Sequence, residues 1–213
     1  MAESLLVHAC CGPCAAAVLE TLRAGGPFTL YFYNPNIQPL LEFRRRAKAF
    51  QVLVEAERVP ALVDLAYDPR FFLRAVPWNE GAPSGRMPPR CLACYRLRLT
   101  ETARMAAERG FSTFTTTLLA STHQDHEAVR RAGEEAARAH GVGFFYADWR
   151  PLAPRAATEA RRRSLYRQQY CGCLFSEAER FGPTGKHLYR GGGGGEVVRP
   201  PREGTAGRPE EDR

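Results

Sequence analysis

The chain opens with the run Leu5-Leu6-Val7-His8-Ala9-Cys10-Cys11-Gly12-Pro13-Cys14, in which a short apolar segment leads directly into three cysteines. The apolar segment predicts a buried strand over 5–9. Apolar residues with helical spacing follow it and predict a helix that ends at Gly25-Gly26. The chain therefore begins with a strand and a helix that are joined by a group of thiols.

The rest of the chain repeats this order of strand and helix. Further strands are expected at 28–33, 62–67, 112–119 and 142–147, and further helices at 42–57, 91–109 and 125–140. Residues 68–90 hold five prolines, so we expect a long irregular connection there. Strands that alternate with helices predict an α/β fold, with a parallel, three-layer, Rossmann-like sheet covered by helices on both faces.

Composition divides the chain into a body and a tail. With 213 residues and 44% hydrophobic content, the chain can bury one core, and we expect a single catalytic domain over 1–189. Residues 190–213 include five consecutive glycines and few apolar side chains, which predicts a disordered tail. The tail has five arginines and five acids, so the formal net charge of +7 lies in the body. A basic body favours a polyanionic partner such as nucleic acid, although a genomic bias towards arginine would give the same charge.

The N-terminus and the cysteine count indicate a compartment. Met1-Ala2-Glu3-Ser4 is acidic where a secretion signal is basic, and the apolar stretch behind it is interrupted by cysteines and Pro13. We therefore expect a cytosolic protein without a membrane span. Thiols stay reduced in the cytosol, so seven clustered cysteines indicate metal binding or catalysis rather than structural disulfides.

Two groups of cysteines have the spacing of metal ligands. Cys10 and Cys11 follow the first strand, at the edge where parallel sheets bind ligands, and Cys14 lies one helical turn further on. Cys91 and Cys94 are also one helical turn apart. The adjacent Cys10-Cys11 pair is unlike the spaced pairs of structural zinc sites, which favours an iron–sulfur cluster over zinc. Burial in the core is the remaining alternative.

Cys171-Gly172-Cys173 is a third and different group. Two thiols separated by one residue can close a small strained disulfide, and strained disulfides are typically labile or catalytic. Redox activity is therefore the favoured interpretation. Metal ligation and simple packing stay open as alternatives.

Five segments of the chain resemble one known family over about residues 4–178. The resemblance is to the cobalamin-independent epoxyqueuosine reductases of the QueH type. The segments that carry it are His8-Ala9-Cys10-Cys11-Gly12-Pro13-Cys14, Tyr33-Asn34-Pro35-Asn36-Ile37, Arg90-Cys91-Leu92-Ala93-Cys94-Tyr95-Arg96-Leu97-Arg98, Phe114-Thr115-Thr116-Thr117-Leu118-Leu119-Ala120-Ser121 and Leu165-Tyr166-Arg167-Gln168-Gln169-Tyr170-Cys171-Gly172-Cys173.

The resemblance implies an activity, a fold and a set of site residues. The implied activity is the reduction of epoxyqueuosine to queuosine at the wobble position of tRNA, the last step of that modification, with an electron donor that the sequence does not identify. The implied fold resembles that of PP-loop nucleotide hydrolases. The implied site consists of a 4Fe–4S cluster on Cys10, Cys11, Cys91 and Cys94, an additional mononuclear iron at Cys14, and a redox-active disulfide between Cys171 and Cys173.

Conversion of an epoxide to an alkene also requires protons. The reaction removes one oxygen as water and consumes two electrons and two protons, which a dithiol or a cluster with an open iron position can assist. The candidate proton donors are His8, His123 and Asp148. A hydrogen-bonded core position is the alternative for His8, and a helix cap or a loop role is the alternative for Asp148.

Basic clusters indicate where tRNA could bind. Residues 150–167 contain six arginines and one acid, and Arg44-Arg45-Arg46 with Lys48 forms a second cluster. Contact with phosphates is the predicted use, with aromatic side chains between them stacking on bases. The alternative is a solvated helix face, and the alternative for the aromatic Trp149 is the core.

Two other function classes are considered. An ATP-dependent tRNA thiolase of the PP-loop type would share the sheet, but it needs a Gly- and Ser-rich phosphate loop where this chain has 10–14. A non-enzymatic zinc module that binds RNA would explain the charge and five cysteines. It would leave the pair at 171 and 173 without a role.

Overall fold

The computed structural model describes residues 4–77 and 87–182. The predicted tail from residue 190 lies outside the described residues. The elements, in chain order, are β1 (Leu5–His8), α1 (Gly12–Ala24), β2 (Phe28–Phe32), α2 (Leu40–Glu57), β3 (Ala61–Val63), α3 (Pro69–Ala75), α4 (Pro89–Glu108), β4 (Thr113–Thr116), the 3₁₀ turn η1 (Thr117–Ala120), α5 (His126–His140), β5 (Gly143–Phe144), the 3₁₀ turn η2 (Arg150–Leu152), α6 (Ala153–Arg162) and α7 (Leu174–Phe181).

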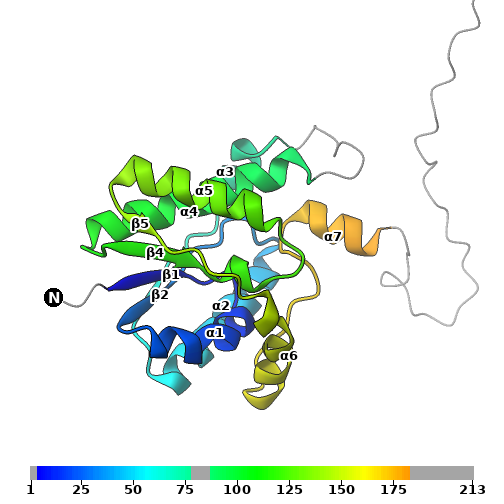
Figure 1. Cartoon of the computed structure of the whole chain (residues 1–213). Coiled ribbons are helices and arrows are strands. Elements are labelled where there is room, and N and C mark those ends of the chain that lie inside the picture. Colours follow the sequence, from blue (N-terminus) through cyan, green and yellow to red (C-terminus); the bar gives the residue numbers. More distant parts are fainter. Residues whose placement is uncertain (1–3, 78–86, 183–213) are drawn as a thin grey trace, which may run out of the picture.

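The sheet is parallel throughout its described strands and has the order β3-β2-β1-β4-β5. Helices α3, α4 and α5 cover one face, and α1, α2 and α6 cover the other (Figure 1). The predicted three-layer α/β class is therefore confirmed. Buried side chains on both faces of the sheet, among them Leu6, Val7, Leu30 and Phe114, form one continuous core with the helices.

The close packing of α1 against α2 fixes the start of α1, where three cysteines lie. Gly12 is buried, and a Cβ added there would lie 3.0 Å from the backbone carbonyl of Ala49 in α2. Pro13 sits in the first turn of α1, where its missing N–H costs nothing. The Cys-Gly-Pro-Cys sequence is thus suited to a helix that begins directly against a neighbouring helix.

Three strands differ from the prediction at their ends. β4 ends at Thr116 rather than at residue 119, because the Thr116 hydroxyl accepts a hydrogen bond from Leu118 N (3.1 Å) and starts the turn η1. β3 and β5 are shorter than the predicted 62–67 and 142–147. Both are edge strands with a single neighbour, so the ladder that extends a strand is available on one side alone.

The predicted irregular connection at 68–90 is wrong for its first residues. Asp68 accepts a hydrogen bond from Arg70 N (3.0 Å), and Pro69 occupies the first turn of α3. The five prolines led to the prediction of an irregular connection, although Asp68-Pro69 is a signal for the start of a helix. Residues 78–86 of the same segment lie outside the described residues.

The strand order creates a topological switch point between β1 and β4. From β1 the chain winds outward through β2 and β3, and then crosses over to β4 on the other side of β1. Ligands bind at such a switch point, beyond the carboxyl ends of the two central strands. Cys10 and Cys11 follow β1 there, and Thr117 follows β4.

Within 4–77 and 87–182, none of the helices has the length and apolar character needed to cross a bilayer.

Candidate metal and redox site

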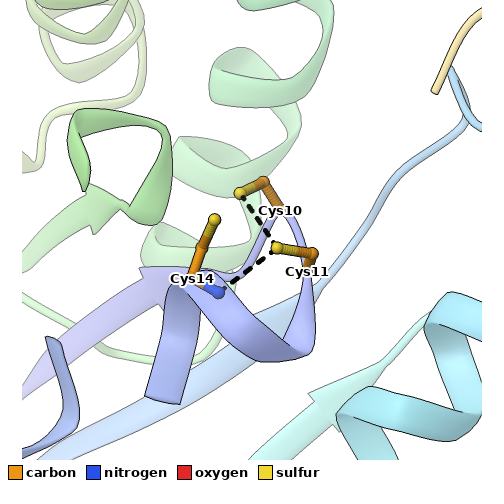
Figure 2. A group of neighbouring side chains, drawn as sticks. All are labelled: Cys10, Cys11 and Cys14. Atoms are coloured by element: carbon orange, nitrogen blue, oxygen red, sulfur yellow. Dashed lines mark hydrogen bonds between the residues drawn. The ribbon is translucent and has the colours of Figure 1, made fainter. Parts of the chain in front are cut away.

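The first thiol group lies at the junction of β1 and α1. The sulfurs of Cys10, Cys11 and Cys14 all lie within 4.8 Å of one another, and they point toward a shared space (Figure 2). The Cys10 and Cys11 sulfurs are 4.0 Å apart. Thr117 of the neighbouring strand end holds Cys10 through hydrogen bonds to its amide (3.0 Å) and its sulfur (3.1 Å). The predicted convergence of these thiols is therefore observed.

Cys11 has the environment of a thiolate. It is the N-cap of α1, and its sulfur accepts hydrogen bonds from Cys14 N (3.3 Å) and from the Gln168 amide (3.0 Å). A further hydrogen bond comes from the Cys10 thiol, and together these donors hold the pKa of Cys11 well below its ordinary value. The hydrogen bond to Cys11 correspondingly raises the pKa of Cys10 to about 11. Cys11 is thus the sulfur of this group whose thiolate form is most favoured.

The second thiol group lines a pocket at the same edge of the sheet. Cys91 and Cys94 of α4 line it together with Cys171 and Cys173, which come from the segment between α6 and α7. Burial raises the pKa of Cys91 to about 11 and that of Cys94 to about 12. The predicted partners Cys91 and Cys94 therefore share one pocket with the predicted redox pair.

The two thiol groups lie near each other. Cys10 of the first group is close enough to Cys171 of the second to influence its ionisation. All seven cysteines are free thiols in the structure, and Cys171 is exposed whereas Cys11 and Cys94 are buried. The pair at 171 and 173 is therefore present as a dithiol at the rim of the site.

The loop that carries Cys171 and Cys173 is held by contacts to α2 and to Gln38, two residues before the start of α2. The Arg46 guanidinium donates to the carbonyls of Cys171 (2.8 Å) and Tyr170 (3.0 Å). Gln38 N donates to the Gly172 carbonyl (2.8 Å). These contacts bring a segment more than 120 residues away in sequence onto the first turns of α2.

Several residues that complete the site were not predicted from the sequence. Gln168 binds the Cys11 sulfur, and Gln124 lies 3.9 Å from the Cys171 sulfur and accepts from the Tyr95 hydroxyl (2.8 Å). Arg98 is 2% exposed and lines the pocket with the second thiol group. Its position one turn beyond Cys94, on the buried face of α4, was a readable signal, because a charged residue rarely occupies such a position.

His8 is a core residue in the structure. Its Nε2 donates to the Tyr33 carbonyl (3.0 Å), so its Nδ1 accepts from the Thr116 hydroxyl (2.8 Å). Burial, with the charge of Arg98, lowers the pKa of His8 to about 4. Both ring nitrogens are used in the core, and this geometry favours the hydrogen-bonded alternative over proton donation.

Asp148 has the geometry of a cap. It is exposed, and its carboxylate accepts a hydrogen bond from Arg150 N (3.0 Å) at the start of η2. The hydrogen bond from the Arg150 guanidinium holds the pKa of Asp148 far below its ordinary value, so the group is ionised at neutral pH. The geometry favours the cap or loop role over proton donation. The third candidate, His123, donates its backbone N–H to Ser121 Oγ (3.2 Å) in the turn before α5.

Most arginines of the predicted 150–167 cluster are paired within the chain. Arg155 pairs with Glu20, Arg162 with Glu159, and Arg163 with both Glu57 and Glu159. Trp149 is buried in the core, as its alternative interpretation requires. The cluster is therefore largely a set of ion pairs that fasten α6.

Three of the four residues of the second basic cluster are exposed, whereas Arg46 is buried and pairs with Glu42. We call Arg44, Arg45 and Lys48 the α2 basic strip; all three are exposed, and none of them pairs with a carboxylate of the described residues. The Arg45 guanidinium lies over the Tyr166 ring at 5.7 Å. Arg46 points the other way, into the site, so the strip lies on the outer side of the helix that holds the Cys171 loop.

The fold and the site define a class of protein: a parallel α/β protein with a cluster of free thiols at the switch point of its sheet. Residues 5–179 match the profile of the family described as Epoxyqueuosine reductase QueH. The chain belongs to that family. The match spans every cysteine of the two thiol groups.

Named relatives agree with the family match. The chain is 35% identical to the Epoxyqueuosine reductase QueH of Dehalococcoides mccartyi over 85% of this chain and 97% of that protein. It is 34% identical to the protein of the same name from Histophilus somni, over 82% of this chain and 72% of that protein. The thiolase and zinc-module alternatives are thus not favoured.

A likeness to solved structures is weaker. A deacetylase in complex with teicoplanin is 14% identical, with a TM-score of 0.46 over 76% of this chain and 86% of that chain. The predicted resemblance of the sheet to PP-loop nucleotide hydrolases stays a prediction.

Proposed function

We propose that this chain reduces the epoxide of epoxyqueuosine at the wobble position of tRNA to the alkene of queuosine, in the cytoplasm. The observation that carries the proposal is the meeting of free thiols from three distant segments at the ligand edge of a parallel sheet. Family membership supplies the substrate class. The reaction belongs to the oxidoreductases.

The thiols fit a metal centre. Thiolates are the ligands of iron–sulfur clusters, and the sulfurs of Cys10, Cys11 and Cys14 lie within 4.8 Å of one another, whereas Cys91 and Cys94 line the pocket at the same edge of the sheet. In our proposal Cys10, Cys11, Cys91 and Cys94 hold a 4Fe–4S cluster, and Cys14 holds an additional mononuclear iron. When bound, these groups supply single electrons and a Lewis-acidic position for the leaving oxygen.

Cys171 and Cys173 would supply the electron pair. Oxidation of the two thiols to a disulfide releases two electrons and two protons, which balance the loss of the epoxide oxygen as water. An electron donor outside the chain then reduces the disulfide. The exposure of Cys171 supports this role, because a donor has to reach a sulfur of the pair.

Contact with tRNA would use exposed cations and aromatic rings beside the site. The α2 basic strip lies on the helix that also holds the Cys171 loop. Tyr166 and Tyr170 are half-buried between this helix and the loop. Such a surface suits a backbone of phosphates that leads to an unpaired base.

The test is a turnover assay with anaerobically purified full-length protein. Transfer RNA that carries epoxyqueuosine is supplied with a chemical reductant, and its nucleosides are analysed by mass spectrometry. We expect conversion to queuosine, with loss of one oxygen, by protein that contains iron and sulfide. Absence of conversion by such protein would reject the proposed reaction. Activity of protein that holds stoichiometric zinc and no sulfide would reject the proposed cluster but not the proposed reaction.

Two variants separate the roles of the thiols. Cys171→Ser and Cys173→Ser should each keep iron and sulfide but lose turnover, since a cycling dithiol needs both sulfurs. Loss of iron together with activity would instead make the pair ligands. Full activity of both variants would reduce the pair to a packing role.

A further inference from the structure

Arg98 is a buried cation with incomplete pairing. Its side chain is 2% exposed, and its Nη2 has no hydrogen-bond partner among the described residues. Its Nε donates to the Cys94 carbonyl one turn back along α4, at a long 3.4 Å. Within 4–77 and 87–182, no carboxylate forms an ion pair with it. A guanidinium held away from water in this way is costly unless an anion compensates it.

Two other arginines near the site show what compensation looks like in this protein. Arg46 is equally buried, but it pairs with Glu42 at 2.7 Å and donates to two carbonyls. Arg90, in the first turn of α4, pairs with Glu179 of α7. Arg98 differs from both, because no carboxylate of the described residues pairs with it.

The thiols around Arg98 come from all three cysteine-bearing segments. Cys94 lies on the same helix, and Cys171 lines the same pocket. Cys10, at the end of β1, is also close enough to interact with the Arg98 charge. A metal converts neutral thiols to thiolates and creates a centre of net negative charge. That centre would provide the anion that Arg98 lacks.

We propose that Arg98 is the internal counter-cation of an anionic metal–thiolate centre that includes Cys10 and Cys94. Its charge favours metal binding, and it is uncompensated in the metal-free fold. Arg98 is thus a positioning residue that acts through the metal ligands. The inference rests on the proposed function for the presence of a metal at these cysteines, and it holds for iron–sulfur and for zinc alike.

Loss of the Arg98 charge should change the stability of the metal-free protein and its metal affinity in opposite directions. A packing role does not predict this. Arg98→Met keeps an unbranched apolar side chain but removes the charge, so it should raise the thermal midpoint of the metal-free protein. The same substitution should weaken metal binding. A unit charge a few ångströms from the centre is worth on the order of tenfold or more in affinity.

The experiment compares full-length wild-type protein with Arg98→Met, Arg98→Lys and Arg104→Met. Each protein is stripped anaerobically with a chelator; its thermal midpoint is recorded, and its affinity for Zn²⁺ is measured by competition with a chromophoric chelator. Arg98→Met should melt higher without metal and bind Zn²⁺ about tenfold or more weakly. Arg98→Lys retains the charge and should bind Zn²⁺ nearly as the wild type does. Arg104, on the exposed side of α4 and paired with Glu101, is the matched control.

Two outcomes would overturn the inference. An unchanged Zn²⁺ affinity in Arg98→Met would show that the charge does not act on the centre. A metal-free Arg98→Met protein that melts lower, or does not fold, would show that Arg98 stabilises the fold by packing. Both readouts are independent of tRNA turnover, so a failure of the proposed reaction is distinguishable from a failure of this inference.

Discussion

Gly172 separates the two cysteines of the redox pair, and its backbone requires a glycine. Its φ is +134°, a conformation that side chains rarely adopt. A Cβ at this position would lie 3.0 Å from the Arg46 guanidinium and 3.1 Å from Ile37. The glycine therefore sets both the direction of the loop and its closeness to α2.

We expect Gly172→Ala to displace the Cys171 loop and to lower the free energy of unfolding by roughly 1–3 kcal/mol. Turnover should fall, because the two thiols lose their position beside the pocket. Chemical denaturation and the turnover assay measure the two effects. Gly26→Ala is the matched control: its φ is +115°, and nothing lies within 4 Å of an added Cβ. Equal turnover losses in both variants would contradict the packing argument.

At the residue scale the sequence predicts which thiols lie close together better than it predicts the surroundings of the candidate proton donors. Cysteine spacing indicates which sulfurs can meet, because helical and strand periodicity are local properties. The partners of His8 cannot be read in this way. They are Thr116 and the Tyr33 carbonyl, at sequence separations of 108 and 25. The same holds for Gln168, which reaches Cys11 from 157 residues away.

Among the elements, Glu57 joins three helices at one point. It lies at the end of α2, and its carboxylate pairs with Arg23 of α1 (3.0 Å) and with Arg163 after α6 (2.6 Å). The hydrogen bond from Arg163, with that from Arg23, lowers the pKa of Glu57. This contact fastens the helix layer on which Cys11 and the Cys171 loop depend.

We expect Glu57→Gln to destabilise the protein by about 1 kcal/mol at pH 7. A carboxylate with a lowered pKa stabilises the fold above its unfolded pKa, and this contribution is lost as the pH falls through the folded pKa. The difference from wild type should therefore be constant well above the ordinary pKa of a glutamate and disappear once the pH is below the lowered pKa of the folded state. Urea denaturation at several pH values measures it. Glu135→Gln, in an exposed pair with Arg96, should show a smaller effect at every pH; a pH-independent loss in Glu57→Gln would assign it to packing.

The sequence predicts the elements of the central layer and the long helices, but not every boundary. β1, β2, α1, α2 and α5 follow apolar periodicity, which directly reports a buried face. β5 consists of two residues and depends on its pairing with β4. Cys173 is the N-cap of α7, and its sulfur accepts from Ser176 N (3.4 Å), so the start of this helix was concealed by a residue interpreted for its redox chemistry.

In the whole molecule, the site results from topology. The strand order brings the ends of β1 and β4 together, and the returning chain after α6 places the third cysteine pair beside them. Cysteine spacing predicts each pair, and the α/β pattern predicts the shared edge. The pattern does not predict that Arg98 would lie buried among the thiols, because its burial arises only when β1, α4 and the Cys171 loop assemble.

The whole molecule also determines which of its many arginines are available to a polyanion. Arg155 and Arg162 are engaged with Glu20 and Glu159, whereas Arg44 and Lys48 of the α2 basic strip are exposed without a carboxylate partner among the described residues. A paired arginine has to give up its ion pair to contact a phosphate, and this loss offsets much of the free energy that the new contact gains. The free cations should therefore carry the phosphate contacts.

We expect the double variant Arg44→Gln with Lys48→Gln to weaken tRNA binding and to reduce the slope of log K against log salt concentration by about 1.4–1.8, since each lost phosphate contact removes roughly 0.7–0.9. Fluorescence titrations of tRNA at several salt concentrations measure this slope. The matched control, Arg155→Gln with Arg162→Gln, removes the same formal charge from paired positions and should change the slope much less. A larger change in the control than in the α2 variant would move the tRNA surface to α6, because salt dependence counts the phosphate contacts themselves rather than the net charge of the protein.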